Sequence, residues 1–431
     1  MFVLDLCGLI FNMQPSIHQT VDHLFRHESG KMIAVLSGLL GLQHLQAAED
    51  IVQDTLFQAL QTWTYNGMPK NPAGWLHRVA RNKAIDFLRR NKHFQHNISP
   101  EYSYLLQSEE VLTPTDNLFF ANEDIEDSQL RMIFACCHPA IPLESQLALA
   151  LKTLCGLSTS EISRAFLTSE ETIAKRIYRA KEKIRTEKII LEMPPAAQLT
   201  SRLQAVLHCL YLLFNEGYNS AHPSQLIREE LCEEAMRLAY LLTKSPKTNK
   251  SGTNALLALF CFQASRLRAR LDEGGNIILL KHQDRTLWYT PLINTGFYFL
   301  SNATDEDTSA YHLEAAIAYF HAIATDFNQT NWKAIYHLYG ILSKEQPTPF
   351  IALNKGIAAL YAEDAATALD ELKAIKGLFN YYLYYTALGQ VYFESGEKGA
   401  AHDYFRKALS LTYSLPEQQL LLAKMQACEA G

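Results

Sequence analysis

Two stretches of the chain place arginine and lysine at the spacing of one helix face. In residues 158–185, the side chains that fall together are Thr172, Lys175, Arg176, Arg179 and Lys183. In residues 74–92 they are Arg78, Arg81, Asn82, Arg89 and Lys92, opposite an apolar face formed by Leu76, Val79, Ala80, Ala84, Phe87 and Leu88. Such faces can follow a phosphate backbone, and the start of a helix can enter the major groove. A solvated surface helix, or a helical hairpin without a DNA partner, explains the same charges.

Residues suited to catalysis or to metal binding are few. The Cys136-Cys137-His138 run invites a metal or nucleophile interpretation, but adjacent cysteines cannot share one tetrahedral site without strain, and core packing is favoured. Asp284-Arg285 and the acids Asp272 and Glu273 form no nucleophile, base and orienting group, so a turn with a structural ion pair is favoured over a hydrolase site. Phosphate-binding glycine loops are missing. We therefore expect no catalytic residue, no metal and no cofactor: the protein binds rather than catalyses.

The second basic stretch should be positioned by two short helices. Two capping boxes, Ser158 with Glu161 and Thr168 with Glu171, predict that both helices begin within about ten residues of one another. Their apolar positions predict the shared core of a helix-turn-helix. These positions are Ile162, Ala165 and Phe166 on the first helix and Ile173, Ile177, Ala180 and Ile184 on the second.

Composition describes a large folded protein. The 431 residues are 48% hydrophobic and 19% charged, with a formal net charge of −6, so any DNA contact must come from local basic patches. Helical periodicity dominates and predicts an all-α fold, with Ile277 to Leu280 as the best candidate for a strand. Eight scattered cysteines and the lack of zinc spacing fit a reduced cytoplasm. The first residues carry Asp5 and no basic segment, which predicts an N-terminal extension rather than a signal peptide.

The chain divides by charge and by proline. Residues 93–130 contain eight acids and no lysine or arginine, which is typical of a linker. Pro194-Pro195 should end the helical block before it. Beyond, the polar residues 215–218 follow the apolar run 203–214, and we interpret them as a helix end with Gly217 in a left-handed cap, a ligand or partner site being the alternative.

The C-terminal end repeats itself. Ala352, Gly356, Ala359, Ala368, Leu372 and Ile375 align with Tyr385, Gly389, Tyr392, Ala401, Phe405 and Ala408 at an offset of 33 residues. The second copy resembles a tetratricopeptide unit, whose period is about 34. The small residues Gly356 and Ala368 should let paired helices approach closely.

These features together resemble the sigma-70 family, specifically its extracytoplasmic-function factors. AAEDIVQDTLFQALQTW resembles the region-two helix that docks on the β′ clamp helices, NPAGWLHRVARNKAIDFLRR the segment that opens and reads the minus-ten element, and ETIAKRIYRAK the region-four recognition helix. Ala174 and Lys175 depart from the usual recognition pattern. RMIFACCHPAIPLESQLALALKTLCGLSTSEISRAFL, LYLLFNEGYNS and LLKHQDRTLW resemble the subgroup with a tetratricopeptide-like extension.

The resemblance implies domains, partners and site residues. The expected order is an N-terminal extension (1–15), sigma region two (16–92), an acidic linker (93–130), sigma region four (131–190), a helical connecting domain (191–305) and a tetratricopeptide-like domain (306–431). The implied partners are core RNA polymerase, through its β′ clamp helices and β flap, promoter DNA, and an unknown protein or peptide for the C-terminal domain.

Each implied partner has its own residues. Glu49, Asp50, Gln53 and Asp54 should face β′, and the loop from Tyr65 to Asn71, with Arg78, Arg81 and Asn82, should meet the minus-ten strand. The expected function is promoter-specific initiation of transcription in the cytoplasm, regulated by the extension. Two alternatives remain: a helix-turn-helix regulator with a tetratricopeptide sensor that acts without core polymerase, and a C-terminal enzyme that uses the sigma-like part for targeting.

Overall fold

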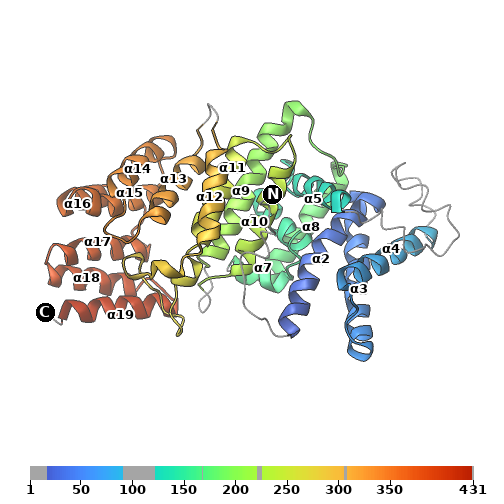
Figure 1. The fold of residues 1–431 in the computed structure, drawn as a ribbon, viewed down its shortest axis with the longest axis horizontal. Helices are drawn as coiled ribbons and strands as arrows, with labels where there is room; N and C mark the ends of the chain where they lie inside the picture. Colours follow the sequence, from blue (N-terminus) through green and yellow to red (C-terminus); the bar gives the residue numbers. More distant parts are fainter. Residues whose placement is uncertain (1–16, 91–121, 167, 221–225, 305–307, 430–431) are drawn as a thin grey trace. The chain divides into compact units, whose positions relative to one another are not determined.

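The computed structural model describes residues 17–90, 122–166, 168–220, 226–304 and 308–429. Figure 1 shows helices throughout these ranges, which confirms the predicted all-α fold. Extended pairing in the described residues is limited to one antiparallel bridge between Leu271 and Ile277. The strand predicted at Ile277 to Leu280 is therefore wrong beyond that bridge, because Leu280–His282 already forms a 3-10 turn. None of the described helices is long and apolar enough to cross a membrane.

The chain forms two compact units, Asn12–Leu212 and Leu213–Gly431. The first unit begins with three helices and a short 3-10 turn: α2 (Ile17–Leu40), η1 (Leu42–His44), α3 (Leu45–Asn66) and α4 (Pro72–Arg90). Pro72 opens α4, a position where its missing N–H costs no helical hydrogen bond. The three helices bury one apolar face each, and the fully buried side chains include Met32, Leu36, Leu39, Val52, Leu76 and Leu88.

Four further helices follow in the same unit. They are α5 (Asn122–Cys136), α6 (Leu143–Thr153), α7 (Thr159–Ala165) and α8 (Glu170–Thr186). Helix α5 begins inside the range predicted as acidic linker; the rest of that linker, and the predicted N-terminal extension, lie outside the described residues. Cys136 and Cys137 are buried, as the core-packing interpretation predicted, and the Cys136 Sγ lies 3.3 Å from the Thr153 hydroxyl.

The two groups of helices pack on one another through α2. Helix α2 contacts both α5 and α6. Gly30 marks the closest approach, because a Cβ atom there would lie 2.0 Å from the Leu154 carbonyl oxygen. Helix α9 (Ala196–Tyr218) starts directly after Pro194-Pro195, whereas the preceding helix α8 already ends at Thr186, before the stop predicted at the prolines. Its first half belongs to this unit: Arg202 donates to the Phe134 carbonyl, and the Cys209 Sγ lies 3.7 Å from Gln146 Oε1.

The second unit starts with the end of α9, followed by α10 (Glu229–Lys244) and α11 (Ser251–Ala264). The cap predicted at Gly217 is wrong, because α9 continues to Tyr218 and Gly217 has no positive φ. Gly217 instead lets α10 approach: an added Cβ would lie 2.7 Å from the Cys232 nitrogen, and the Gly217 carbonyl accepts from Arg228 N at 2.7 Å. Helix α11 is buried on almost every side, which fits the unbroken apolar run from Ala255 to Phe262.

Short turns connect α11 to the next helices. The turns are η5 (Leu267–Ala269), η6 (Leu280–His282) and η7 (Arg285–Leu287), and they lead to α12 (Thr290–Ser301) and α13 (Ala310–Ile323). The predicted turn at Asp272 is present, since its Oδ1 accepts from the backbone N–H of Gly274 at 2.9 Å and Asn276 at 2.8 Å. The predicted ion pair between Asp284 and Arg285 is wrong: Asp284 caps η7 by accepting from Thr286 N at 2.8 Å.

The rest of the unit is a series of helical hairpins (Figure 1). Its helices are α14 (Trp332–Glu345), α15 (Pro349–Ala362), α16 (Ala365–Lys373), α17 (Tyr382–Glu394), α18 (Lys398–Leu409) and α19 (Leu415–Glu429), and each contacts the next. A Cβ atom on Gly356 would lie 2.7 Å from the Leu372 side chain, and one on Gly389 would lie 2.6 Å from Phe405. The two glycines and their neighbours are equivalent positions of the predicted repeat, so both hairpins use the same close contact.

Candidate nucleic-acid interface

Helix α7 begins with the first predicted capping box. Glu161 N donates to the Ser158 hydroxyl at 3.1 Å, and Ser158 N donates to the Glu161 carboxylate at 2.7 Å. These two bonds satisfy N–H groups that have no partner inside the helix. The start of α7 is therefore fixed by local sequence, as predicted.

The second predicted capping box, Thr168 with Glu171, is wrong. Helix α8 begins at Glu170, so the cap position falls on Ser169, whose hydroxyl accepts from Thr172 N at 3.1 Å. Glu171 lies one turn from Lys175 and pairs with it at 2.6 Å. The prediction placed the cap one residue early because serine and threonine are both favoured there.

The predicted core of the helix-turn-helix is confirmed at most positions. Ile162 on α7 and the inner face of α8 are buried, whereas Phe166 is half-buried and the Ala165 side chain lies outside the described residues. The buried α8 residues are Ile173, Ile177, Ala180 and Ile184. With this face buried, the opposite face of α8 carries the cations.

The outer face of α8 holds all five predicted DNA-contacting side chains. Lys175, Arg179 and Lys183 are exposed; Thr172 and Arg176 are half-buried. Arg176 pairs with Glu144 of α6, and Lys183 lies 3.3 Å from Glu187. The sequence prediction did not include Tyr178, which lies beside Arg179 with 65% of its surface exposed.

Helix α4 presents part of its predicted cationic face. Arg78, Asn82 and Arg89 are exposed, but Arg81 is only 9% exposed, so its assignment to the outer face is wrong. The reason is helical spacing: Arg81 lies three and seven residues before the buried Ala84 and Leu88, on their side of the helix. Lys92 lies outside the described residues.

The last turn of α3 and the loop before α4 are exposed, and the start of α4 is capped. Tyr65 is 88% exposed and Met68 is 49% exposed. Asn71 caps α4, since its Oδ1 accepts from Gly74 N at 2.9 Å. On the other side, the Trp63 and Trp75 rings meet edge to face at 5.5 Å. Tyr65 in the last turn of α3 and Met68 in the loop are thus both exposed next to the capped start of α4.

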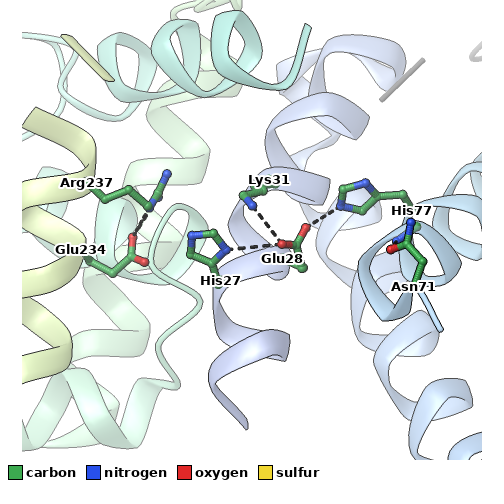
Figure 2. A network of polar contacts seen from close by, with 8 residues as sticks. His27, Glu28, Lys31, Asn71, His77, Glu234 and Arg237 are labelled. Atoms are coloured by element: carbon green, nitrogen blue, oxygen red, sulfur yellow. Dashed lines mark hydrogen bonds and ion pairs between the residues drawn. The ribbon is translucent and has the colours of Figure 1, made fainter. Parts of the chain in front are cut away.

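A buried carboxylate joins α4 to α2, as Figure 2 shows. Glu28 is 4% exposed, and its oxygens lie 2.6 Å from His77 Nε2, 2.9 Å from Lys31 Nζ and 3.3 Å from His27 Nδ1. Burial by itself would raise the pKa of Glu28, but the hydrogen bonds with His27 and His77 and the charge of Lys31 lower it well below its usual range. Glu28 is therefore ionised and fixes α4 to the unit.

The residues expected to face the polymerase differ in exposure. Asp50, Gln53 and Asp54 are exposed on α3, whereas Glu49 is only 4% exposed. The Glu49 carboxylate lies 2.6 Å from Lys181 Nζ of α8, 132 residues away in sequence. Beside the exposed acids, α3 also leaves Phe57 61% and Leu60 50% exposed. The sequence prediction missed Lys181, Phe57 and Leu60; only the helical spacing of Phe57 and Leu60 after Gln53 could have indicated the last two.

Comparisons with known protein families match both groups of helices in the first unit to sigma-70 family models. Residues 24–94 match the family model "Sigma-70 region 2", and residues 131–184 match "Sigma-70, region 4". Residues 202–304 match a model described as "Family of unknown function (DUF6596)". No solved structure matches the chain.

Two similar proteins match different shares of the chain. "Uncharacterized protein R00370" of Rhizobium meliloti is 35% identical over 87% of this chain and 88% of its own length. "ECF RNA polymerase sigma factor SigE" of Mycolicibacterium smegmatis is 27% identical over 38% of this chain and 60% of its own length. The chain therefore belongs to the sigma-70 family, as a sigma factor of the extracytoplasmic-function type with a long C-terminal extension. The matches to both sigma regions favour this class over the two alternatives considered above.

Proposed function

We propose that this sigma factor initiates transcription at specific promoters by reading two DNA elements with two surfaces. The exposed cations of α8 contact the minus-thirty-five element, and the loop before α4, with Arg78 and Asn82, contacts the minus-ten strand. The observation that carries the proposal is that both sigma-region matches fall on helices with exposed basic side chains.

The proposed polymerase surface lies on α3. It consists of the exposed acids Asp50 and Asp54, Gln53 between them, and the exposed Phe57 and Leu60. Exposed apolar side chains next to polar ones are typical of protein interfaces. Glu49 joins this surface only after its ion pair with Lys181 opens, which would also separate α3 from the recognition helix α8.

We further propose that the extension after α9 regulates the sigma regions, and that the full chain is the active form. Hairpin repeats ordinarily present a binding surface, and the extension is far longer than promoter reading requires. Its partner is a protein or peptide whose identity the repeat geometry leaves open.

The test is co-purification with purified core polymerase, followed by transcription in vitro. Asp50→Lys combined with Asp54→Lys should abolish co-purification with core polymerase, because both charges of the proposed surface are reversed. The matched control is Asp370→Lys combined with Asp403→Lys on α16 and α18, outside the sigma regions. Undiminished core binding by the folded α3 double variant would reject the proposed surface.

A further inference from the structure

Three arginines in the second unit have no carboxylate partner among the described residues. Arg266 Nε donates to the Tyr218 hydroxyl at 2.6 Å, and Arg270 donates to the Tyr218 carbonyl. Arg285 Nη1 donates to the His321 carbonyl at 2.6 Å. All three therefore donate to neutral groups rather than to carboxylates.

The acid with the strongest electrostatic influence on Arg285 is Asp326, but its carboxylate is used elsewhere. Asp326 Oδ1 accepts from the backbone N–H of Asn328 at 2.7 Å and of Gln329 at 3.0 Å. Burial, together with the nearby charge of Arg266, lowers the pKa of Arg285 below its ordinary value. The cluster therefore has an excess of positive charge that an anion would relieve.

Aromatic rings hold these guanidinium groups in place. Arg285 stacks on the Trp288 ring, 3.9 Å from its centroid, and Arg266 lies 5.9 Å from the same centroid. Arg270 lies 3.9 Å from the centroid of Tyr218. A stacked guanidinium keeps its edge available for a planar acceptor such as a carboxylate or a phosphate.

Three buried polar atoms in the same cluster have no hydrogen-bond partner. They are Arg285 Nη2, Trp288 Nε1 and His321 Nδ1, and Trp288 as a whole is only 4% exposed. The Arg285 guanidinium stacks on the Trp288 ring and donates to the backbone carbonyl of His321. The His321 imidazole is also close enough to feel the charge of Arg285, so the three side chains are neighbours. Native proteins rarely leave buried polar atoms unpaired, and several together indicate an absent ligand, ion or water.

His321 strengthens this interpretation. Burial, with the charges of Arg266 and Arg285, lowers the pKa of His321 to about 3. The ring is therefore neutral near pH 7 and adds no charge, while its Nδ1 can donate or accept according to tautomer. The group thus offers two fixed N–H donors and one adaptable nitrogen.

We propose that Arg285, Trp288 and His321, with Arg266 beside them, form a binding site for a small ligand that carries a phosphate or carboxylate group. The guanidinium and indole N–H groups donate to the ligand oxygens, and the arginines neutralise its charge. The ligand would connect segments that are distant in sequence: the start of the turn η5, the turn η7 and helix α13. The extension would then bind a small anion in addition to the polymerase and DNA contacts of the sigma regions.

The test measures binding to the full-length protein without polymerase, so its result is independent of the proposed function. Isothermal titration with inorganic phosphate and, separately, with succinate distinguishes the two oxyanion classes. Sodium chloride at matched ionic strength is the reference. Saturable heat with phosphate or succinate, accompanied by a rise in the thermal unfolding midpoint, is expected. Absence of saturable binding of both anions to the wild-type protein would overturn the proposal.

Variants then locate the site. Trp288→Phe keeps the ring that Arg285 stacks on but removes the N–H donor, so affinity should fall several-fold with little change in the stability of the unliganded protein. Arg285→Gln should lose binding. The matched control is Arg406→Gln on α18, whose side chain is exposed and pairs with Asp403 at 2.7 Å. Unchanged affinity in both Trp288→Phe and Arg285→Gln would assign the binding to another place and reject the site.

Discussion

Arg179 differs from the other basic residues on the outer face of α8 in having no ion-pair partner among the described residues. Lys175, Arg176 and Lys183 each pair with a glutamate, so a phosphate that bound these cations would first have to displace an acid. A phosphate bound by Arg179 competes with no such acid. We therefore expect Arg179 to contribute more to promoter affinity than its neighbours do.

Arg179→Ala should weaken promoter binding and reduce the steepness of log affinity against log salt by about 0.9 for one lost phosphate contact. The measurement is fluorescence anisotropy with a promoter duplex at several salt concentrations. Arg185→Ala is the control, because Arg185 is exposed in the last turn of α8 and pairs with Glu182. Equal salt slopes for the wild-type protein and Arg179→Ala would contradict the assignment.

Glu28 makes the stability of the first unit depend on pH. Its pKa in the folded protein is lowered, after the opposing effect of burial, by His27, His77 and Lys31, whereas an unfolded glutamate titrates near about 4.3. The folded state therefore gains stability from the ionised carboxylate above that pH, and loses it as the pH falls toward the lower folded pKa.

Glu28→Gln should destabilise the protein at pH 7 by on the order of 3 kcal/mol, because it removes one partner of a buried charged network. The variant should also lose part of the stability change between pH 5 and more acidic solution. Urea unfolding monitored by tryptophan fluorescence in a Trp288→Phe and Trp332→Phe background, which leaves Trp63 and Trp75 of this unit as the fluorophores, checks both effects. The prediction fails if the two proteins show parallel stability curves over the acidic range.

At this scale the sequence predicts what local spacing controls. The capping box joins Ser158 and Glu161, which are three residues apart, and it was predicted. The ion pair of Glu49 and Lys181 joins positions that are 132 residues apart. No helical period connects such positions, so only the packing of α3 near α8 reveals them. The prediction for Arg81 was wrong for a different reason. Arg81 lies near the boundary between the two helix faces, and its charge led to its assignment to the exposed face.

At the scale of helices, two glycines at equivalent positions of the repeats each allow a close contact between paired helices. An added Cβ on Gly356 or Gly389 would lie well inside the ordinary contact distance of Leu372 or Phe405. The offset of 33 residues predicted their equivalence. By contrast, the role of Gly217 was missed, since its close neighbour is α10 rather than a local turn.

Gly356→Ala and Gly389→Ala should each destabilise the second unit by about 1 to 3 kcal/mol, since the packed hairpin must move to admit a methyl group. Gly340→Ala is a matched control in helix α14, where a Cβ would meet nothing within 4 Å. That change should stabilise the helix by about 1 kcal/mol, the difference in helix propensity between glycine and alanine. Thermal unfolding measures the stability of all three variants. A loss of stability in Gly340→Ala equal to that in the other two would contradict the packing argument.

At the scale of the whole molecule, α9 decides where the sigma regions can be separated from the extension. The Pro194-Pro195 break suggests a cut before α9, but the first half of α9 belongs to the first unit. Leu203, Val206 and Leu207 are at most 5% exposed, and Arg202 donates to the Phe134 carbonyl. A cut at Pro195 therefore removes part of the core, which the sequence alone could not show.

A chain ending at Tyr218 retains all of α9 and should unfold at a higher temperature than one ending at Pro195, because each buried leucine contributes about 1.5 to 3 kcal/mol. Because the chain ending at Tyr218 keeps its stability, any loss of its transcription activity reports on the missing extension itself. We expect the chain ending at Tyr218 to bind core polymerase yet to initiate less promoter-specific transcription than the full chain. The comparison requires matched core occupancy and several protein concentrations. Equal transcription by the folded full chain and the folded chain ending at Tyr218 would reject intramolecular control. Recruitment of a partner would then remain as the role of the extension.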